Sequence, residues 1–482
     1  MEKTNQEVGK TQTTPNALTT PLAKSTRKCG VLGKSLPHSY SPQIHAALTS
    51  RYTYEIIERE ENELEELARK AVFDGFNVTI PYKKNMHAKC EQYGRLSDAA
   101  KTIGAVNTVA RLHDGTLYGD NTDAYGFAYM LHDAGIDVAG RNCLILGTGG
   151  ASVAVEYALR NLKAASISFC SRSGEINYDN VLTKLPDTEV IVNTTPVGMY
   201  PNVDLSPLAI GGPASLDKFK KLQAVADIIY NPSRTRLLYD ATKLGIKTAG
   251  GLSMLVAQAY KAQHVFEAAF EFTECGDTKC SQDAKVLCIP SDEELTARGS
   301  NVINQITRSL EDKMLNITLV GMPGSGKSFI GKQIAEKTGR EFVDLDVLFG
   351  REVGRIPSEV IEQDGEEQFR RLETEVAKGA LARSGLVIST GGGIVTRERN
   401  EFYLKMNSRV IYIDRALAAL EKQDKSDRPI SRKKSIASLL EERAPLYEKV
   451  ADETWSLGDF SPEADQELRE KIEGLQARME QK

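Results

Sequence analysis

A glycine-rich segment in the C-terminal half has the residue types that bind nucleotide phosphates. Residues 321–328 read GMPGSGKS, which fulfils the pattern GxxxxGK[ST] directly after the apolar run NITLV. The glycines, Gly324 and Gly326 among them, let backbone N–H groups converge on phosphate oxygens at a helix N-terminus. Lys327 adds a positive charge at the β- and γ-phosphates, and Ser328 supplies a hydroxyl to Mg²⁺. The pattern therefore predicts a nucleotide site.

Two carboxylates follow a β-type run in the same half. In FVDLDVLFG the run ends in Asp344 and Asp346, which lie two residues apart. Because side chains alternate along a strand, this spacing predicts that both carboxylates lie on the same side of the strand end. All six histidines precede residue 265, so this half cannot use a histidine base. A weak base is enough for phosphoryl transfer, which needs mainly positioning and charge stabilisation.

A second glycine turn lies near the middle of the chain. GTGGAS comes directly after the apolar run NCLIL and before a helical stretch, which is typical of a dinucleotide-binding βαβ unit, although a tight structural turn has the same pattern. Arg172 and Ser173 follow the next strand, SISFC, where an NAD site has an acidic residue. The cation favours the 2′-phosphate of NADP. The residues predicted to approach the dinucleotide in the turn are Gly147, Gly149, Gly150 and Ala151.

Length and composition limit the class of protein. The chain has 482 residues, and at roughly 150 residues per domain about three domains are expected. Lys plus Arg number 61 and Asp plus Glu 66, a balance that argues against nucleic acid or a membrane as partner. No apolar run reaches the roughly 18 residues of a membrane helix, and residues 1–14 lack the apolar stretch expected of a secretory signal. Seven cysteines, an odd number, fit reduced thiols in the cytoplasm.

The elements that must position these residues alternate along the chain. β-type runs such as FNVTI and AVNTVARL alternate with helical periodicity, which predicts α/β domains with largely parallel sheets. Residues 1–27 are rich in Thr, Lys and Asn, and we expect a disordered leader. Residues 274–313 are polar and acidic apart from the island VLCIP, and we expect an interdomain linker there.

The C-terminal segment, about residues 314–475, resembles the shikimate kinases of the nucleoside-monophosphate-kinase-like fold. The P-loop, the paired aspartates, the FRxxE segment, the triple glycine, the DRP element and the ERAPLY segment occur in family order. The resemblance implies ATP and Mg²⁺, with Ser328 and Asp344 at the metal and Asp346 at the reacting hydroxyl. It places Arg428 in a lid over the phosphates, although a solvated surface arginine is the alternative.

The same resemblance implies a pocket for one carboxylate and several hydroxyls. The planar fork of arginine suits a carboxylate, although Arg370 could instead form a helix-surface ion pair with Glu366 or Glu373. Glycines allow a ring to lie against the main chain. The residues implied for the substrate are Asp346, Arg370, Gly391, Gly392, Gly393 and Arg443.

The N-terminal segment, about residues 28–273, resembles shikimate dehydrogenase. Seven motifs occur in family order: GKSLPHSYSP, GFNVTIPYK, IGAVNTV, GDNTDAYG, NTTPVGM, IIYNPSRTRLL and GLSMLVAQA. The resemblance makes Lys83 the proton-transferring group and Asp123 its partner. An ionised Asp123 favours the ammonium form of Lys83, so we predict that Lys83 acts most readily as a general acid. The segment between Arg172 and NTTPVGM is short for the family, which indicates a lost or shortened βα element.

Further site residues follow from the same resemblance. We expect neutral hydrogen-bonding groups to hold the carboxylate and ring hydroxyls, although the two serines could simply be turn residues. Three other residues match positions near the nicotinamide end of the cofactor: Asp98, Ile228 and Gly251. The residues implied for the substrate are Ser39, Ser41, Thr79, Asn107, Tyr230 and Gln258.

Together these observations predict an α/β protein. The resemblances imply a dehydrogenase-type substrate domain over 28–125, completed by about 252–273, a Rossmann NADP domain over 126–251 and a P-loop kinase domain over 314–482. The expected activity is reduction of 3-dehydroshikimate with NADPH, followed by phosphorylation of shikimate with ATP. The alternatives are a quinate or quinate/shikimate dehydrogenase in the first half, or a non-catalytic regulator. The expected partners are small molecules, and the sequence does not indicate an oligomeric state.

Overall fold

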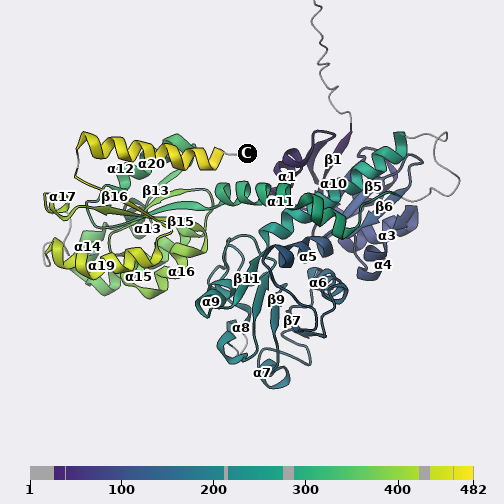
Figure 1. Ribbon diagram of the computed structural model, residues 1–482, viewed down its shortest axis with the longest axis horizontal. Coiled ribbons are helices and arrows are strands. Elements are labelled where there is room, and N and C mark those ends of the chain that lie inside the picture. Colours follow the sequence, from purple (N-terminus) through teal and green to yellow (C-terminus); the bar gives the residue numbers. More distant parts are fainter. Residues whose placement is uncertain are drawn as a thin grey trace, which may run out of the picture.

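The computed structural model describes residues 27–37, 39–210, 215–274, 287–422, 435–459 and 461–480. Three sheets organise this part of the chain, one of six strands and two of five. Each sheet lies in its own unit, and we refer to the units as the first, second and third in chain order (Figure 1). The predicted α/β class is confirmed.

The first unit contains a mixed sheet with the strand order β2-β1-β3-β5-β6-β4. The prediction of a largely parallel sheet is confirmed, since only β5 runs against the other strands of this sheet and is antiparallel to both of its neighbours, β3 and β6. A tight turn with Gly115 at φ 82° joins β5 to β6, and so short a connection permits only antiparallel pairing. The strands are β1 Lys28–Gly33, β2 Thr53–Glu58, β3 Gly75–Val78, β4 Gly94–Leu96, β5 Thr108–Arg111 and β6 Leu117–Asp120. The helices are α1 Ser41–Leu48, η1 Glu61–Glu63, α2 Leu64–Arg69, α3 Lys83–Tyr93 and α4 Asp98–Ile103.

The second unit contains a fully parallel sheet with the order β11-β10-β9-β7-β8. The strand order reverses between β7 and β9, which is where doubly wound sheets bind nucleotides. The described connection from β8 to β9 contains only the four-residue helix α7, in keeping with the predicted shortening. The strands are β7 Asn142–Leu146, β8 Ser166–Cys170, β9 Val190–Asn193, β10 Ala224–Asp227 and β11 Lys247–Gly250. The helices are α5 Asp123–Asp133, α6 Gly150–Asn161, α7 Val181–Lys184, α8 Pro207–Ile210, η2 Leu216–Lys218 and α9 Arg236–Lys243.

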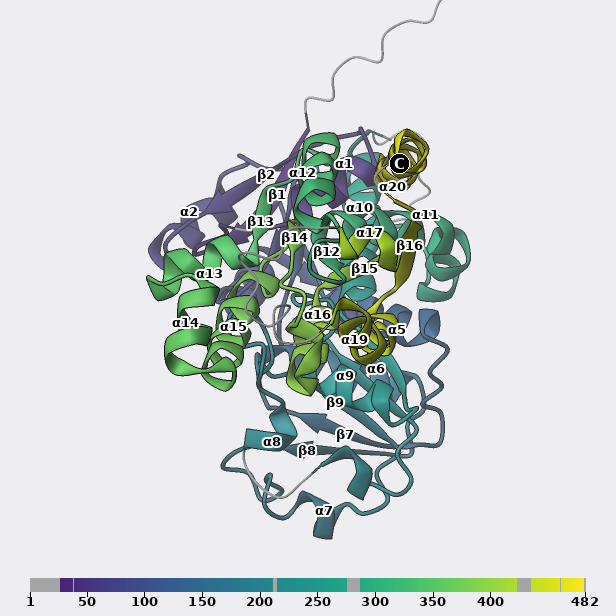
Figure 2. The ribbon, with the colours of Figure 1, turned by 90° about the vertical axis from the view of Figure 1, so that its left-hand side faces the viewer.

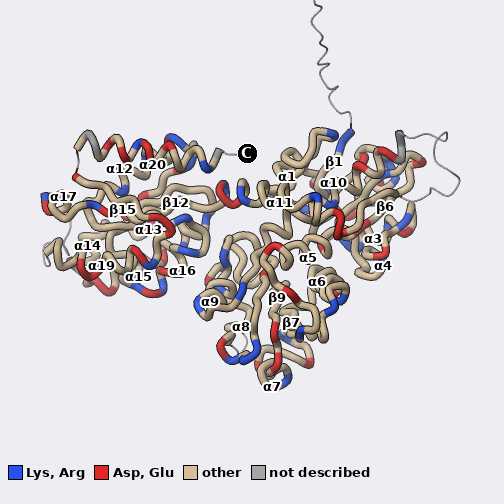
Figure 3. Tube along the Cα trace, viewed as in Figure 1, with Lys and Arg blue, Asp and Glu red and all other residues tan. Residues whose placement is uncertain are grey.

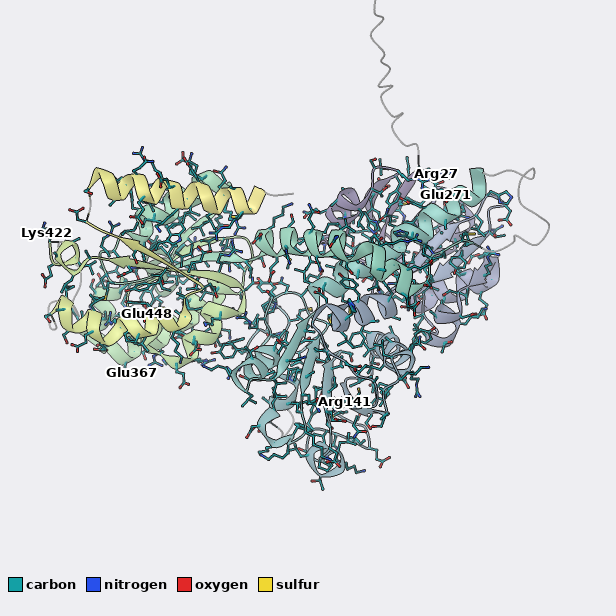
Figure 4. All side chains as sticks on the ribbon, in the orientation of Figure 1. Arg27, Arg141, Glu271, Glu367, Lys422 and Glu448 are labelled. Atoms are coloured by element: carbon teal, nitrogen blue, oxygen red, sulfur yellow. The ribbon has the colours of Figure 1, made fainter. Side chains whose placement is uncertain are left out.

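Helix α10, Leu252–Glu274, returns from the second sheet to the first unit. Its residue Phe266 packs with Cys29 of β1 and with Tyr52 in one apolar cluster. At the far end of the helix the guanidinium of Arg27 lies 4.5 Å from the ring centre of Phe270, near Glu271 (Figure 4). Helix α10 therefore belongs to the core of the first unit, although it follows the second in sequence.

The predicted linker over 274–313 contains a helix that the sequence analysis missed. Residues Asp292–Met314 form α11, which runs beside α10 and leads into the third unit (Figure 1). Leu295 and Ile303 of α11 are buried against Tyr260 of α10. Three of the acidic residues that suggested a linker, Asp292, Glu293 and Glu294, are exposed in the first turn of this helix.

The third unit contains a parallel sheet with the order β13-β14-β12-β15-β16, in which β12 is central. Helices cover both faces of this sheet (Figure 1). The strands are β12 Asn316–Val320, β13 Phe342–Asp344, β14 Val387–Ser389, β15 Ser408–Arg415 and β16 Glu453–Leu457. The helices are α12 Lys327–Thr338, α13 Leu345–Val353, α14 Pro357–Asp364, α15 Glu366–Leu381, η3 Ile394–Thr396, α16 Glu398–Met406, α17 Leu417–Glu421, α19 Ile436–Val450 and α20 Pro462–Glu480.

The third unit packs directly on the second. Helix α16 contacts α9, and the two helices lie next to each other in both views (Figures 1 and 2). Val203 and Tyr239 of the second unit are buried in the same apolar cluster as Phe402 and Tyr403 of α16. The rings of Tyr239 and Phe402 meet edge to face at 5.3 Å between centroids. The two units therefore share part of one core.

Charged residues of both signs are interspersed along all three units (Figure 3). Within the described residues, no helix is long and apolar enough to cross a membrane.

Two candidate active sites

The first candidate site is a cavity of about 510 Å³ between the first and second units. Lys83 and Asp123 enter it from the first residues of α3 and α5, and Tyr230 enters from the connection between β10 and α9. Its wall combines groups from both units, so a ligand there contacts both. The residues predicted from sequence that line it are Ser39, Ser41, Thr79, Lys83, Asn107, Asp123, Ala151, Ile228, Tyr230, Gly251 and Gln258.

Lys83 and Asp123 form an ion pair within this cavity. The distance from Lys83 Nζ to Asp123 Oδ2 is 2.6 Å. The other carboxylate oxygen, Oδ1, accepts a hydrogen bond from Asn107 Nδ2 at 2.8 Å. Asn107 is itself held, because its Oδ1 accepts from the backbone N–H of Thr122 at 2.7 Å. The pair is therefore fixed on a buried amide network that leaves the ammonium facing the cavity.

Aromatic and amide groups also line the cavity. Tyr230 and Tyr40 meet edge to face, with 6.3 Å between ring centroids. The side chain of Gln258 donates from Nε2 to the carbonyl of Leu255 at 2.9 Å, which fixes its amide. Ser39 Oγ accepts from the backbone N–H of Ser41 at 3.3 Å, so Ser39 also has the turn contact that was its alternative interpretation.

The glycine turn after β7 lies at the edge of the same cavity, which Ala151 helps to line. Gly147 has φ 102°, and a Cβ there would lie 2.7 Å from Thr195 Cγ2, so only glycine fits. A Cβ at Gly149 or Gly150 would meet no atom within 4 Å, which leaves room for a ligand to approach the backbone at the start of α6. The turn therefore fits a pyrophosphate.

The remaining predicted cofactor residues lie outside the cavity. Arg172 and Ser173 are exposed and follow β8, whose Cys170 pairs in register with Leu146 directly before the glycine turn. This places the arginine beside the turn. Asp98 is the first residue of α4, and its side chain is 98% exposed and paired with Lys101 at 3.2 Å. The structure therefore does not bring Asp98 into contact with the cavity.

A buried carboxylate supports the strand end that carries Tyr230. Asp227, the last residue of β10, is fully buried. It accepts from Thr235 Oγ1 at 2.7 Å, from Asn193 Nδ2 at 3.1 Å and from the backbone N–H of Ile229 at 3.1 Å. Burial raises the pKa of Asp227 to about 7 in spite of these three hydrogen bonds.

The second candidate site begins at the P-loop between β12 and α12. Gly324 and Gly326 have φ values of 85° and 93°, which L-residues with side chains rarely adopt. Lys327 Nζ donates to the carbonyls of Gly321 and Met322, both at 2.9 Å, so the ammonium lies over the loop. The P-loop thus combines a glycine-rich backbone with the ammonium of Lys327, and a chain of phosphates needs both.

Ser328 and Asp344 lie together at the edge of this loop. Ser328 Oγ donates to Asp344 Oδ2 at 2.6 Å. A hydroxyl and a carboxylate oxygen this close fit Mg²⁺, which keeps several waters and takes its other ligands from phosphates. Within the described residues, no group of three or more His, Cys, Asp or Glu could hold a metal alone. The donor set therefore fits a metal bound together with its nucleotide.

Asp344 and Asp346 were expected on the same side of a strand end, and the structure contradicts this expectation. β13 ends at Asp344, which caps α13 by accepting from the backbone N–H of Asp346 at 3.0 Å. Asp346 is already in the first helical turn, because the chain turns into α13 at once. The cap nevertheless keeps the two carboxylates adjacent. Oδ1 of Asp346 lies 3.1 Å from where a Cβ at Gly391 would be.

Arg370 lies behind the triple glycine. The ion pairs with Glu366 and Glu373 that were its alternative interpretation are present, although Arg370 itself is only 6% exposed. Its Nη1 donates to Glu373 Oε2 at 2.7 Å and its Nη2 to Glu366 Oε1 at 3.3 Å. A Cβ at Gly393 would lie 2.0 Å from Nη2, so only glycine lets the guanidinium reach this place. Burial raises the pKa of Glu373, and the charge of Arg370 opposes that shift.

Arg443 of α19 reaches the same glycines from the other side. It is 3% exposed, and its Nη1 donates to the carbonyl of Gly392 at 3.1 Å, which also accepts from the hydroxyl of Tyr447. A Cβ at Gly392 would lie 2.6 Å from Pro323 Cδ of the P-loop. The two buried arginines and the three glycines therefore lie together next to the nucleotide loop. Arg428 lies outside the described residues.

From the sequence, Glu373 was considered only as a partner for a surface ion pair with Arg370, and Tyr447 was assigned no role. Glu373 is three residues after Arg370 on α15, and Tyr447 is four after Arg443 on α19, so each shares a helix face with its arginine. That spacing was the available signal. It did not indicate that these faces turn toward the glycines and not toward solvent.

The fold and the two sites define the class of protein. A cavity with a lysine–aspartate pair beside a dinucleotide-type turn, joined to a P-loop unit with two buried arginines beside its glycines, defines a dehydrogenase fused to a small-molecule kinase. Residues 31–109 match the family model of the shikimate dehydrogenase substrate binding domain, and residues 323–473 match that of shikimate kinase.

Relatives of known name agree with this class. A shikimate dehydrogenase (NADP(+)) of Clostridium perfringens strain ATCC 13124 is 36% identical over 256 residues, which cover 49% of this chain and 91% of that protein. One from Methanococcus maripaludis strain C6 is 35% identical and covers 49% of this chain and 90% of that protein. The chain belongs to the shikimate dehydrogenase family and continues into a shikimate kinase domain. The crystal structure of shikimate dehydrogenase 1 from Peptoclostridium difficile is 32% identical, with a TM-score of 0.45, and covers 59% of this chain and 98% of that chain.

Proposed function

We propose that the chain is a bifunctional shikimate-pathway enzyme that reduces 3-dehydroshikimate to shikimate with NADPH and then phosphorylates shikimate with ATP. The observation that carries the proposal is the presence, in one chain, of the Lys83–Asp123 pair in a two-unit cavity and of a P-loop beside two buried arginines. The first product is the second substrate, so one small carboxylic acid fits both sites.

In the reduction, NADPH supplies a hydride to the carbonyl carbon, and this chain supplies the proton. Lys83 donates a proton from Nζ to the carbonyl oxygen as negative charge develops there, which yields the hydroxyl of shikimate. Asp123 holds the ammonium in place at 2.6 Å and is held in turn by Asn107. Neutral groups around the cavity bind the ring and its carboxylate, among them Tyr230 and Gln258.

In the phosphorylation, the P-loop and Lys327 bind the triphosphate, and Ser328 and Asp344 would hold Mg²⁺, which neutralises charge on the phosphates. Arg370 and Arg443 bind the carboxylate of shikimate, and Asp346 orients the attacking 3-hydroxyl and accepts its proton. The oxygen then bonds to the γ-phosphorus as ADP leaves. The assignment of Arg428 as a lid residue remains our proposal, as does a cytoplasmic location for the enzyme.

The alternatives are not favoured. A regulator would not need Lys83, Lys327 and Asp346 together, and the two relatives compared above, at 36% and 35% identity, are named shikimate dehydrogenases.

Two point variants test the assignment. With 3-dehydroshikimate, NADPH, ATP and Mg²⁺, the full chain should consume NADPH and form shikimate 3-phosphate. Lys83→Ala should lower the rate of NADPH oxidation by about 10²-fold or more, the contribution of a positioned proton donor. Lys327→Ala should leave that rate unchanged and stop phosphate transfer. The matched control is Lys89→Ala on α3, because Lys89 pairs with Glu65 away from the cavity. Loss of both activities in either variant would contradict independent sites.

A further inference from the structure

The segment that follows Tyr230 is bonded to the third unit. Residues 231–234, which we call the docking segment, run along the C-terminal end of α16. The backbone N–H of Arg234 donates to the carbonyl of Met406 at 2.8 Å, and that of Ser233 to Asn407 Oδ1 at 3.2 Å. The backbone N–H groups of two consecutive residues in the dehydrogenase half, Ser233 and Arg234, therefore donate to acceptors in the kinase half.

Asn407 is placed to hold this segment firmly. It is fully buried, and its Nδ2 donates to the carbonyl of Arg383 at 3.0 Å and to Ser384 Oγ at 3.1 Å. Ser384 Oγ in turn donates to Asn231 Oδ1 at 3.4 Å. The acceptor for Ser233 is thus fixed by contacts within the third unit, and its partner Ser384 makes a second contact with the docking segment.

Both ends of the same connection are fixed within the second unit by Asp227. Asp227 precedes Ile228 and Tyr230, both of which line the cavity, and its carboxylate accepts from the N–H of Ile229. Thr235, directly after the docking segment, donates to the same carboxylate at 2.7 Å. The connection that carries these cavity residues is therefore held by a buried aspartate and also by Asn407.

Contacts around the docking segment hold the two units together. Lys243 of α9 pairs with Glu401 of α16 at 2.8 Å, and Glu401 has a side chain only 8% exposed. Lys378 of α15 pairs with Asp204 of the second unit. These ion pairs flank the apolar contact of Tyr239 with Phe402, so the hydrogen bonds of the docking segment are part of a larger packed face.

We propose that Asn407, a residue of the kinase domain, is a positioning residue of the dehydrogenase reaction. By accepting from Ser233 it sets where Tyr230 and Ile228 meet the substrate and the nicotinamide. This inference rests on the proposed dehydrogenase activity. Its physical basis is that a loop held only at Ile229 and Thr235 samples more conformations than a loop also held at Ser233, and a ligand must then order it on binding.

The first test replaces Asn407 and a matched asparagine. Asn400→Ala is the control, because Asn400 is also buried on α16 but donates to Ile394 within the third unit. In the full chain, Asn407→Ala should raise the KM for shikimate in NADP⁺ reduction about fivefold, as expected for one lost hydrogen bond, with kcat changed less than about twofold. Asn400→Ala should leave both constants of this reaction as in the parent chain.

A second variant keeps the test decisive if Asn407→Ala does not fold. Lys243→Glu places a carboxylate against Glu401 on an exposed part of the face, outside both sites, and should raise the same KM. Lys221→Glu, which faces Asp187 on the same unit, is its control and should not. Amide hydrogen exchange over residues 228–235 should speed up in Asn407→Ala and Lys243→Glu alone.

The outcomes separate the two proposals. Absence of NADPH-dependent reduction in the parent chain would contradict the proposed function. If the parent is active, an unchanged KM in Lys243→Glu, or in a folded Asn407→Ala, would overturn the positioning role. An equal rise in the control of either variant would overturn it as well.

Discussion

Asp227 is a carboxyl group without access to water, at the end of the strand that leads to the dehydrogenase cavity. Because burial raises its pKa to about 7 from an ordinary value of 3.8, the folded chain keeps this proton where the unfolded chain has lost it. Between those two values the folded state binds more protons, so the contribution of Asp227 to stability falls as pH rises. This direction is opposite to that of an ion-paired carboxylate.

Asp227→Asn should therefore remove a pH dependence. Asparagine is neutral at every pH, so the stability of the variant relative to the parent chain should improve as pH rises from 4 to 8. Urea unfolding of both proteins, with a probe that reports the unfolding of the second unit, measures the difference in their free energies of unfolding. A difference that is constant over this range would contradict a raised pKa.

At the scale of residues, the sequence indicated which side chains belong to the sites better than it indicated which residues they contact. Lys83 and Asp123 are 40 positions apart, yet the family motifs that contain them implied their pairing, and the 2.6 Å contact agrees with it. Asp98 matched a motif but is exposed on α4. The role of Glu373 depends on which face of α15 turns inward, and that is decided by packing against the triple glycine and not by the spacing of residues.

Among the elements, α11 shows how composition can hide periodicity. Residues 274–313 are polar and acidic, and the sequence analysis therefore expected a linker. The residues of α11 that are buried nevertheless recur at helical spacing: Leu295, Gly299, Ile303, Ile306 and Leu310. Gly299 lets the helix cross α10 closely, because a Cβ there would lie 2.4 Å from Tyr260 Cε1.

The start of α11 gives a prediction at the scale of the element. Ser291 caps the helix by accepting from the N–H of Glu294 at 3.2 Å, and Glu294 accepts from the N–H of Ser291 at 3.0 Å. Ser291→Ala should destabilise the helix by about 1 kcal/mol. Hydrogen exchange in the first turns of α11 should report it, whereas Ser300→Ala, in mid-helix, should leave those turns unaffected. Equal exchange in all three proteins would show that the cap contributes nothing.

The mixed sheet of the first unit shows a second limit at this scale. Alternating strands and helices favour parallel pairing, and β1 does pair in parallel with β2 and β3. The order of the remaining strands depends on the short turn between β5 and β6, whose consequence for the whole sheet is not contained in local periodicity.

For the whole molecule, the sequence indicated three units but not the face that joins them. Tyr239 and Phe402 lie 163 positions apart and in units with separate motifs, so no local pattern links them. Burial of Glu401 in this face opposes its ionisation, but hydrogen bonds from Lys243 and Lys449 lower its pKa to about 2. Packing of the third unit on the second therefore favours the ionised form of Glu401.

This gives a prediction for acid conditions. Since the folded pKa of Glu401 lies below the ordinary value of 4.5, its contribution to stability is present above pH 4.5 and is lost as pH falls toward 2. Glu401→Gln should therefore be less stable than the parent chain at pH 6, and the difference should shrink at pH 3. Thermal unfolding at both values measures it. A stability difference between Glu401→Gln and the parent chain that grows on acidification would contradict a stabilising role of these ion pairs.

The shared core of the second and third units also bears on how such a gene can evolve. Val203 and Tyr239 are buried against helix α16, so a mutation that split the gene would expose apolar surface on both products at once. Each product would need new polar residues there before it could exist alone without aggregating. Fusion of the two enzymes is thus easier to acquire than to reverse, and lineages that inherit this face are expected to keep both activities on one polypeptide.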